Sequence, residues 1–139
     1  MEQLQHFFRE RGVRLTEPRR EIYRLLNEHE QPLTIAELLK MSRIAERTSV
    51  YRTLELFSKI GLVEAVQIKG KIRYELAEPF KPHHHHIVCT SCGALVPLDS
   101  GRLEKVIRHL ADSSRYELTS HHVELQGRCQ NCVKTTTPT

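Results

Sequence analysis

The sequence predicts an α+β protein with two modules, an N-terminal winged helix-turn-helix followed by a small α/β domain. Up to Gly61, apolar side chains recur at helical spacing in four successive stretches. Two β-rich runs follow, 62–68 and 72–77, and the Lys-Gly-Lys between them is typical of a hairpin. A proline-containing break at 78–82 ends this pattern. Beyond it, a strand-like run, an amphipathic helix and a second strand-like run indicate the smaller domain.

Three of the four expected helices precede residue 42. A short first helix begins near residue 2 and is closed by Gly12. Pro18 lies in the first turn of the second helix, where the missing N–H of a proline costs nothing. Thr34 and Glu37 fit a capping box, in which each side chain satisfies a backbone N–H of the other residue, and they open the third helix.

The fourth helix is the candidate recognition helix of the helix-turn-helix. Thr48 is expected to cap its start and Gly61 to end it. Its apolar side chains recur on one face, which we expect to be buried. This inner face contains Val50, Leu54 and Phe57.

Three polar or aromatic residues of this helix are left facing outward, namely Ser49, Tyr51 and Arg52. In a winged helix-turn-helix the recognition helix enters the major groove of DNA. There Arg52 can read a guanine or contact a phosphate, and Tyr51 can contact a thymine methyl group. The alternative is an arginine in solvent and a half-buried tyrosine with no partner.

The break divides the chain into a winged-helix DNA-binding domain at 1–77, a hinge at 78–82, an α/β domain at 83–132 and a disordered tail at 133–139. The smaller domain contains expected strands at 94–98 and 116–127, with a helix between them. A module of about fifty residues has a small core, so it needs a metal staple, a partner subunit or both. The side chains of the helix expected to point inward are Leu103, Val106, Ile107 and Leu110.

Composition restricts the class of protein. The chain has 139 residues, of which 39% are hydrophobic and 27% charged, a balance typical of a globular protein rather than a disordered one. It has no apolar run long enough for a transmembrane helix, and its first residues lack the apolar core of a signal peptide, so we expect a cytoplasmic protein. The net charge of +4 permits nucleic-acid binding without requiring it.

The four cysteines form two C-x-x-C pairs, Cys89 with Cys92 and Cys129 with Cys132. In the cytoplasm thiols stay reduced, so metal binding is favoured over disulfides. Two such pairs supply the four thiolates of a tetrahedral structural zinc. The metal would close the small domain onto itself, which predicts a zinc-stapled fold. A redox-active C-x-x-C is the alternative.

A run of four histidines, residues 83–86, precedes the first cysteine pair. It lies within the chain, whereas an expression tag lies at a terminus, so a polar run and a set of metal ligands remain as readings. If the run is extended, alternate side chains point to opposite faces. His83 and His85 then serve one site and His84 and His86 serve another, which favours ligands.

Each histidine pair needs further ligands from elsewhere in the chain. Glu104 on the expected helix and His121 on the late strand can complete a His₃Glu set with the first pair. Glu75, at the end of the hairpin, can join the second pair and bridge the two modules. Mixed nitrogen and oxygen ligands suit Zn²⁺, Fe²⁺ or Mn²⁺.

These residues together resemble the Fur (ferric uptake regulator) family of metal-responsive repressors. The resemblance covers nearly the whole chain, through "GVRLTEPRREIYRLL", "TSVYRTLELFSKIGLV", "RYEL", "HHHHIVCTSCG" and "CQNC" in that order. It implies an N-terminal winged helix, a C-terminal α/β dimerisation domain, and a cytoplasmic homodimer that binds operator DNA when loaded with metal. It implies no enzyme activity, no membrane and no small-molecule substrate.

The resemblance also assigns residues by position. Cys89, Cys92, Cys129 and Cys132 match the structural zinc ligands of the family. His83, His85, Glu104 and His121 match one family metal site in full. Glu75, His84 and His86 match three ligands of the inter-domain sensing site, which would hold Fe²⁺, Zn²⁺ or Mn²⁺. Arg14 matches a basic residue near the minor groove, Arg19 a phosphate contact, and the "SVYR" segment the base-contacting residues.

Three departures bear on the metal that is sensed. The histidine that the family places just before the third helix is missing from "QPLT" here, and His29 or Glu64 is a candidate substitute. Ala77 stands where the zinc-sensing branch usually has a cysteine. Pro97 stands where the peroxide-sensing branch usually has an aspartate. Iron-type sensing is therefore slightly favoured over these two branches.

The resulting hypothesis is a metal-dependent repressor in which metal bound at the inter-domain site fixes the spacing of the winged helices, and loss of metal frees the hinge. Two rivals come from other classes. A zinc hydrolase would use His83, His85 and His121 with Glu104 as base, but no H-E-x-x-H or comparable motif is present. A metal-storage protein would have no need for "TSVYRTL" on a helix.

Overall fold

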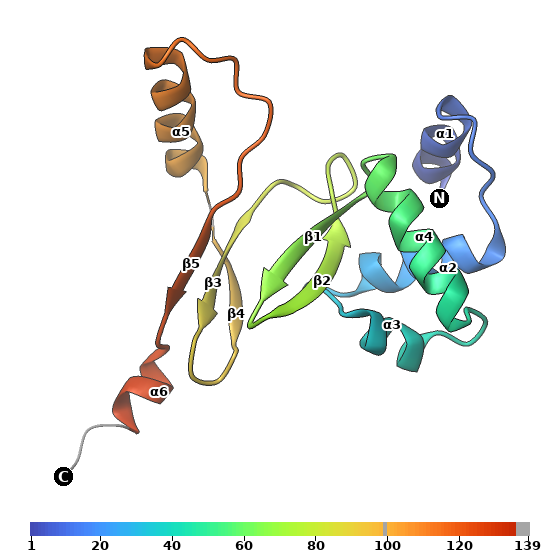
Figure 1. Ribbon diagram of the computed structural model, residues 1–139, viewed down its shortest axis with the longest axis horizontal. Coiled ribbons are helices and arrows are strands. Elements are labelled where there is room, and N and C mark those ends of the chain that lie inside the picture. Colours follow the sequence, from blue (N-terminus) through green and yellow to red (C-terminus); the bar gives the residue numbers. More distant parts are fainter. Residues whose placement is uncertain (99, 136–139) are drawn as a thin grey trace. The chain divides into compact units, whose positions relative to one another are not determined.

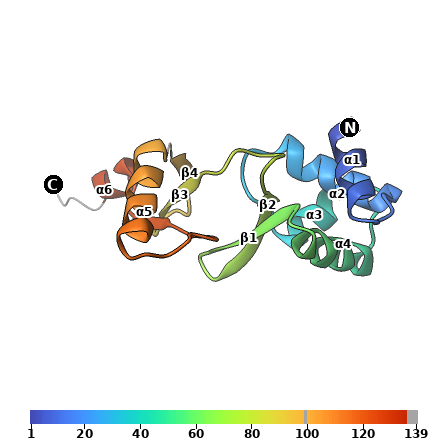
Figure 2. The ribbon, with the colours of Figure 1, turned by 90° about the horizontal axis from the view of Figure 1, so that it is seen from above.

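The computed structural model describes residues 1–98 and 100–135, and the chain divides into two compact units, Met1–Pro82 and His83–Thr139. Each unit has its own sheet. Within the described residues, the first unit has four helices and a two-stranded sheet, and the second has a three-stranded sheet and two helices; Figures 1 and 2 show their arrangement within each unit.

The first unit contains α1 (Glu2–Glu10), α2 (Glu17–Glu28), α3 (Ile35–Met41), α4 (Arg47–Lys59), β1 (Val63–Ile68) and β2 (Lys71–Leu76). The two strands pair antiparallel, and an isolated bridge between Leu33 and Tyr74 adds a third short segment to this wing. Four helices followed by an antiparallel hairpin confirm the predicted winged helix-turn-helix.

One apolar cluster holds the first unit together, and all four helices and both strands contribute to it. The predicted inner face of α4 is confirmed, because Val50, Leu54 and Phe57 are fully buried. The ring of Phe57 packs edge-to-face on Phe8 of α1, with ring centroids 5.8 Å apart. Each apolar side chain of this size that leaves water contributes about 1.5–3 kcal/mol, so the position of α4 is fixed mainly by its inner face.

The start of α4 differs from the prediction. Glu46 is its N-cap, with no side-chain cap hydrogen bond, and Thr48 lies inside the first turn. The backbone of Glu46 is extended (φ −77°, ψ 163°), so the chain enters the helix there, two residues before the predicted cap. The turn before the helix has a side-chain bond of its own, in which Ser42 Oγ accepts from the Ala45 N–H at 2.8 Å.

The capping box predicted for α3 is present. The Thr34 N–H donates to Glu37 Oε2 at 2.7 Å, and the Glu37 N–H donates to Thr34 Oγ1 at 3.2 Å. Arg73 of β2 adds an ion pair to Glu37 Oε2 at 3.0 Å. Partial burial alone would raise the pKa of Glu37, but the hydrogen bonds from Thr34 and the charge of Arg73 outweigh it and lower the pKa. The wing is thereby tied to the start of α3.

In the segment predicted as a hinge, 78–82, Phe80 and Lys81 are partly buried and contact other residues of the first unit, while the other three residues are exposed. The ring of Phe80 contacts those of Phe7 and Tyr23, with centroids 5.1 and 5.5 Å away. Lys81 Nζ donates to the Glu30 carbonyl at 2.8 Å. Aromatic packing and a lysine anchor hold this segment, so free rotation at 78–81 would require these contacts to break.

The second unit contains β3 (His85–Cys89), β4 (Leu95–Leu98), α5 (Gly101–Ser113), β5 (Glu124–Gly127) and α6 (Gln130–Lys134). The strand order is β4-β3-β5, with β3 antiparallel to β4 and parallel to β5. The parallel pair requires a crossover, which α5 and the segment after it provide. This confirms a small α/β domain after the winged helix.

Two predictions for this unit need correction. The strand expected at 116–127 is confined to β5, and residues 115–123 have no regular structure, because only four residues pair with β3. The disordered tail expected from residue 133 is partly helical, since α6 includes Val133 and Lys134 and the helix positions Cys132. Residues 136–139 of that tail lie outside the described residues.

The apolar face predicted to point inward from α5 is not buried within one chain. Val106 and Leu110 are 53% and 59% exposed, and no residue of α5 is buried. The predicted inward face is therefore wrong for Val106 and Leu110, and none of the residues in the described ranges buries them. None of the helices in the described ranges is long and apolar enough to cross a membrane.

Replacing Glu37 with Gln should lower the free energy of unfolding by about 1 kcal/mol near neutral pH, the typical contribution of a capping interaction. Because the pKa of Glu37 is lowered in the folded state, its contribution is present above the carboxyl's ordinary pKa and is lost as the pH falls through the folded value. Urea unfolding of both proteins over this pH range tests it. The difference should vanish in acid, with Glu55→Gln, an exposed change on α4, as the control. A difference independent of pH would contradict the account.

Candidate metal centres and nucleic-acid surface

The four cysteines converge at one end of the second sheet. Cys89 ends β3, Cys92 follows in a tight turn, and Cys129 and Cys132 lie at the start and within α6. Their four sulfur atoms all lie within 4.8 Å of one another, and those of Cys92 and Cys129 are 3.8 Å apart. A tetrahedral zinc with bonds of about 2.3 Å places its sulfur ligands roughly 3.8 Å apart. The cluster therefore fits a structural zinc.

Backbone N–H groups prepare this cluster for metal. The N–H groups of Cys129 and Cys92 donate to Cys89 Sγ at 3.3 and 3.5 Å, and they lower the pKa of that thiol to about 5. Hydrogen bonding to the sulfur of Cys129 is the main cause that raises the pKa of Cys132 to about 12. The thiols of Cys89 and Cys132 thus have pKa values shifted in opposite directions. A zinc ion would hold all four as thiolates, so its binding releases protons.

A second cluster forms around Glu104, in the first turn of α5. The Nε2 atoms of His85 and His121 lie 2.7 and 3.0 Å from Glu104 Oε1, and His83 Nε2 lies 3.5 Å from it. His83 Nε2 and His121 Nε2 are 3.1 Å apart. All four ligand atoms lie within 4.8 Å of one another. This is the His₃Glu set expected from the sequence, drawn from the β3 end, α5 and the segment before β5.

The electrostatics of this cluster suit a cation. Partial burial alone would raise the pKa of Glu104, but hydrogen bonds from His121 and His85 and the charges of His121 and His83 outweigh it and lower the pKa. The His85 side chain is only 2% exposed, so its ring has little access to water. Three imidazole nitrogens aimed at one carboxylate oxygen form a donor set that Zn²⁺, Fe²⁺ or Mn²⁺ accepts.

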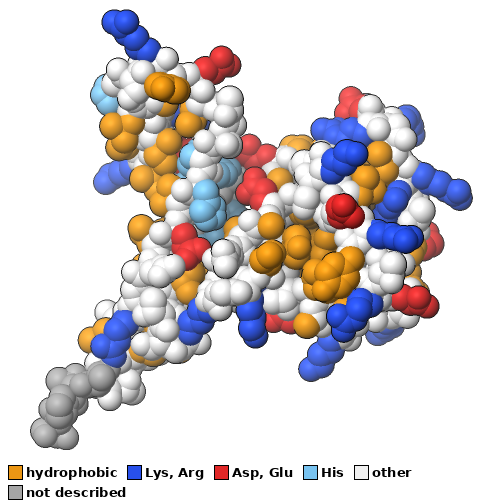
Figure 3. All heavy atoms as spheres, in the orientation of Figure 1, with side chains coloured by type: hydrophobic (Ala, Val, Ile, Leu, Met, Phe, Trp, Pro, Cys, Tyr) orange, Lys and Arg blue, Asp and Glu red, His pale blue; other side chains and the backbone are white. Residues whose placement is uncertain are grey.

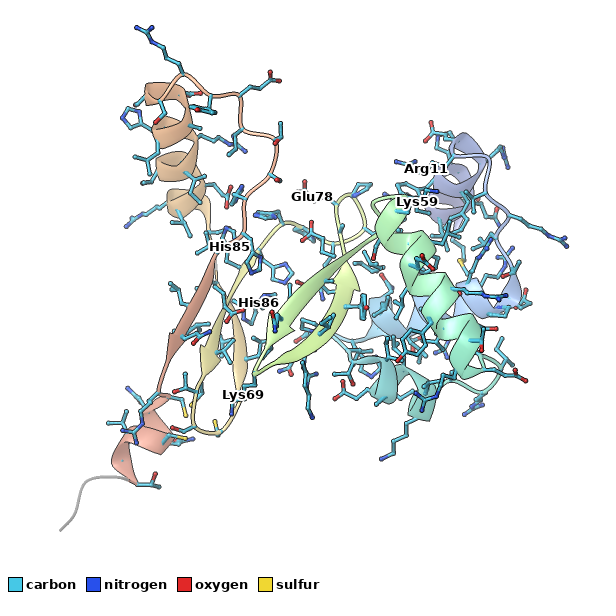
Figure 4. The ribbon with its side chains drawn as sticks, viewed as in Figure 1. Arg11, Lys59, Lys69, Glu78, His85 and His86 are labelled. Atoms are coloured by element: carbon cyan, nitrogen blue, oxygen red, sulfur yellow. The ribbon has the colours of Figure 1, made fainter. Side chains whose placement is uncertain are left out.

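His84 and His86 form a separate pair, with their Nε2 atoms 3.0 Å apart. Figure 4 labels His85 and His86, which are consecutive on β3, and their side chains go to different clusters. This is the alternation expected of an extended run. Glu75 is buried on β2 of the first unit, where Lys81 Nζ lies 3.9 Å from its Oε2. Its role as a further ligand of this pair stays a prediction.

The two candidate substitutes for the missing sensing histidine, His29 and Glu64, both lie in the first unit. His29 is the C-cap of α2, and its Nδ1 lies 2.7 Å from the Leu25 carbonyl oxygen. Glu64 is an exposed residue of β1. Lys81 was not singled out from the sequence. It lies five residues after the end of β2, and tertiary packing brings it near Glu75. Such packing leaves no signal in the sequence.

The residues of the candidate DNA surface lie on α4, in the first turn of α2 and just before α2. Tyr51 is 50% exposed, Arg52 is exposed and Ser49 is partly exposed, so all three lie on the face opposite the buried stripe. Arg14 is exposed, and Arg19 donates to its carbonyl oxygen. Figure 3 shows lysine and arginine side chains on the surface of the first unit.

Comparison with known proteins agrees with this combination of a winged helix and metal clusters. The chain is 30% identical over 132 residues to a ferric uptake regulation protein of Synechococcus elongatus, covering 90% of this chain and 89% of the relative. The solved structure of the ferric uptake regulator of Helicobacter pylori, described with three functional metal-binding sites, has the same fold, with a TM-score of 0.78 at 23% identity over 98% of this chain and 93% of that one.

A zinc uptake regulator solved with zinc and DNA is also similar, with a TM-score of 0.64 and 26% identity over 96% of this chain and 92% of that one. Residues 10–126 match the family model described as the ferric uptake regulator family. Relatives named for iron and for zinc both align with this chain over most of its length. The chain therefore belongs to the ferric uptake regulator family and is a transcriptional regulator rather than an enzyme.

Proposed function

We propose that this regulator is a cytoplasmic repressor that binds operator DNA as a homodimer when its regulatory divalent metal is bound. The observation that carries this proposal is the pairing, in one chain, of a winged helix that exposes a polar face of α4 with a second unit whose histidine, glutamate and cysteine ligands already converge. Iron is the slightly favoured metal, because Ala77 and Pro97 depart from the patterns of the zinc- and peroxide-responsive branches. Those branches are the alternative.

In this proposal the structural zinc stabilises the second unit. Apart from the metal-ligand residues, few side chains of this unit are buried, among them Val88 and Leu95. Zinc held by the four cysteines would join the end of β3 to α6. A core of this size needs such a link, which supports the structural role.

A second copy of the chain is proposed to cover the apolar face of α5. Val106 and Leu110 of that helix are more than half exposed, and Leu125 of the edge strand β5 is 46% exposed. An edge strand offers unpaired backbone groups to another strand. A two-fold contact that uses the same surface on both copies is the commonest way to bury such a face.

The exposed face of α4 is proposed to read bases, while Arg19 in the first turn of α2 contacts a phosphate and Arg14, just before that helix, lies near the minor groove. A dimer presents two such faces, so its operator should be two-fold symmetric with half-sites about one helical turn apart or a multiple of that. The net charge of +4 per chain is modest, so phosphate neutralisation needs both subunits.

The regulatory metal is proposed to bind Glu75, His84 and His86. The close approach of the two histidine nitrogens and the burial of Glu75 support this assignment. Metal shifts an equilibrium only by its differential affinity for two states. The metal-bound state would therefore be the state whose winged helices match the operator spacing. Loss of metal would lower operator affinity.

Replacing His86 with Ala should abolish the stimulation of DNA binding by Mn²⁺ or Fe²⁺ while leaving the dimer intact, because only the regulatory set loses a ligand. Fluorescence anisotropy with a duplex selected by the metal-loaded wild-type protein measures the first effect, and analytical ultracentrifugation the second. His6→Ala, an exposed change on α1, serves as the control. Undiminished stimulation in the His86 variant would remove this residue from the regulatory site.

Replacing Cys92 with Ser should remove the zinc and lower the melting temperature, because the β3 end and α6 lose their link. In zinc-finger peptides the binding of a structural zinc contributes about 10–16 kcal/mol to the free energy of folding, so its loss here should lower stability strongly. Zinc content by mass spectrometry under native conditions and thermal unfolding test this together. Ser91→Ala, at the neighbouring exposed position, should retain both zinc and stability. A stable variant without zinc would show that the ion is dispensable for the fold.

Two arginine variants should differ in how they weaken DNA binding. Arg52→Ala should cost about 1–3 kcal/mol and relax base preference at one position of each half-site. Arg19→Ala should weaken all sequences similarly and reduce the salt dependence by about one unit of slope. Affinities for matched and substituted duplexes at several salt concentrations separate these outcomes. Identical behaviour of the two variants would contradict the assigned roles.

A further inference from the structure

We propose that Glu21, a buried carboxylate on α2, positions the recognition helix by holding the turn that precedes it. This inference rests on the proposed DNA binding and deepens it, since it names a residue that acts on recognition through other residues. Glu21 lies beside the core-facing residue Ile22 and is not part of any of the three metal-ligand sets described above.

Glu21 is an unusual residue for its position. Glutamate is almost never fully buried unless it is paired, yet Glu21 is only 8% exposed. Its Oε1 accepts a hydrogen bond from the Arg43 N–H at 2.9 Å, and Arg24 Nη2 lies 3.9 Å from the same oxygen. Its Oε2 is buried and has no hydrogen-bond partner among the described residues. A buried carboxylate with one oxygen unpaired is unfavourable for stability, which points to a role other than stability.

The partner of Glu21 lies in the turn at 42–46, between α3 and α4. Within this turn, Ser42 Oγ accepts from the Ala45 N–H, and α4 then begins with no side-chain cap. In the described part of the chain, the bond from the Arg43 N–H to Glu21 is the side-chain hydrogen bond that joins this turn to an element other than α3 and α4. Glu21 thus ties the start of α4 to α2.

The start of α4 is also where DNA contacts are proposed. Ser49, Tyr51 and Arg52 all lie within the first six residues of the helix, and recognition helices contact bases mainly through their N-terminal residues. The buried stripe fixes the body of α4, whereas the bond to Glu21 fixes its entry. A shift of about 1 Å in a supporting contact is enough to loosen a binding site. Loss of this bond should therefore weaken base reading.

The sign of the effect separates positioning from charge. A carboxylate near the DNA surface repels phosphates, so removing its charge should, by electrostatics alone, tighten binding to any duplex. A positioning role depends instead on whether the side chain is long enough to place an acceptor oxygen at the Arg43 N–H. Glu21→Gln removes the charge but keeps an acceptor oxygen at the same distance from the Arg43 N–H. Glu21→Asp keeps the charge but withdraws the carboxylate by one methylene.

The experiment compares both variants with the wild-type full chain, loaded with zinc and Mn²⁺. The probes are the duplex that the wild-type protein selects from a random pool and an unrelated duplex of equal length. Glu21→Asp should bind the selected duplex about tenfold more weakly, comparable to the loss of one base contact. Its affinity for the unrelated duplex and its salt slope should not change. The Arg43 amide should exchange with solvent faster in this variant, and Glu21→Gln should resemble the wild type in all four measurements.

The inference is overturned if Glu21→Asp binds the selected duplex like the wild type, or if both variants tighten or weaken binding to both duplexes equally. Thermal unfolding of each variant at the assay temperature identifies a loss caused by unfolding. If Glu21→Asp does not fold, Glu21→Gln still decides. A charge role predicts that this variant binds both duplexes more tightly, which would overturn the inference, whereas a positioning role predicts that its affinity for both duplexes is unchanged. If the wild-type protein selects no duplex, the proposed function fails first and this inference falls with it.

Discussion

The alternation of side chains along β3 and the residues before it is the constraint on which the second unit depends. His83 and His85 turn toward Glu104 and His121, while His84 and His86 form a pair of their own. Three residues after the last histidine, Cys89 ends the same strand and begins the thiolate cluster. A shift of one residue in the pairing of β3 with β4 and β5 would exchange the two histidine faces. One short strand therefore sets the ligands of every cluster in this unit.

These clusters bring metal-ligating groups close together, and in the His₃Glu cluster His85 and His121 hydrogen-bond Glu104. In the His₃Glu cluster, three imidazole rings surround one carboxylate oxygen, and in the thiolate cluster four sulfurs lie within 4.8 Å. The burial of such polar groups is favourable only when they are paired. A metal ion bound there would supply that pairing and would link β3 to α5 or α6. The first unit, by contrast, is held by a continuous apolar core. A winged-helix unit with its own apolar core, joined to a unit that carries metal-ligand clusters, suits a metal-responsive regulator.

Much of the fold could be predicted because local rules decide it. The capping box at Thr34, the buried stripe of α4 and the two C-x-x-C pairs all follow from spacing within one element. The failures have tertiary causes. The apolar face of α5 was expected to be buried, but the described residues of one chain leave it unburied. The strand before β5 was overestimated, because alternation does not reveal where pairing stops. Phe80 and Lys81 in the expected hinge, and Glu21 on α2, are held by residues distant in the sequence, and no pattern signals such contacts.

The central claim is that metal binding in the second unit controls DNA recognition by the first. Selection from a randomised duplex pool tests it most directly, with the full-length protein carrying its structural zinc and run first without further metal, then with Fe²⁺, Mn²⁺ or Zn²⁺. The account predicts that a two-fold symmetric sequence is enriched only when the regulatory metal is present, and most strongly with Fe²⁺. Enrichment of the same sequence without added metal, or of no sequence under any condition, would contradict it.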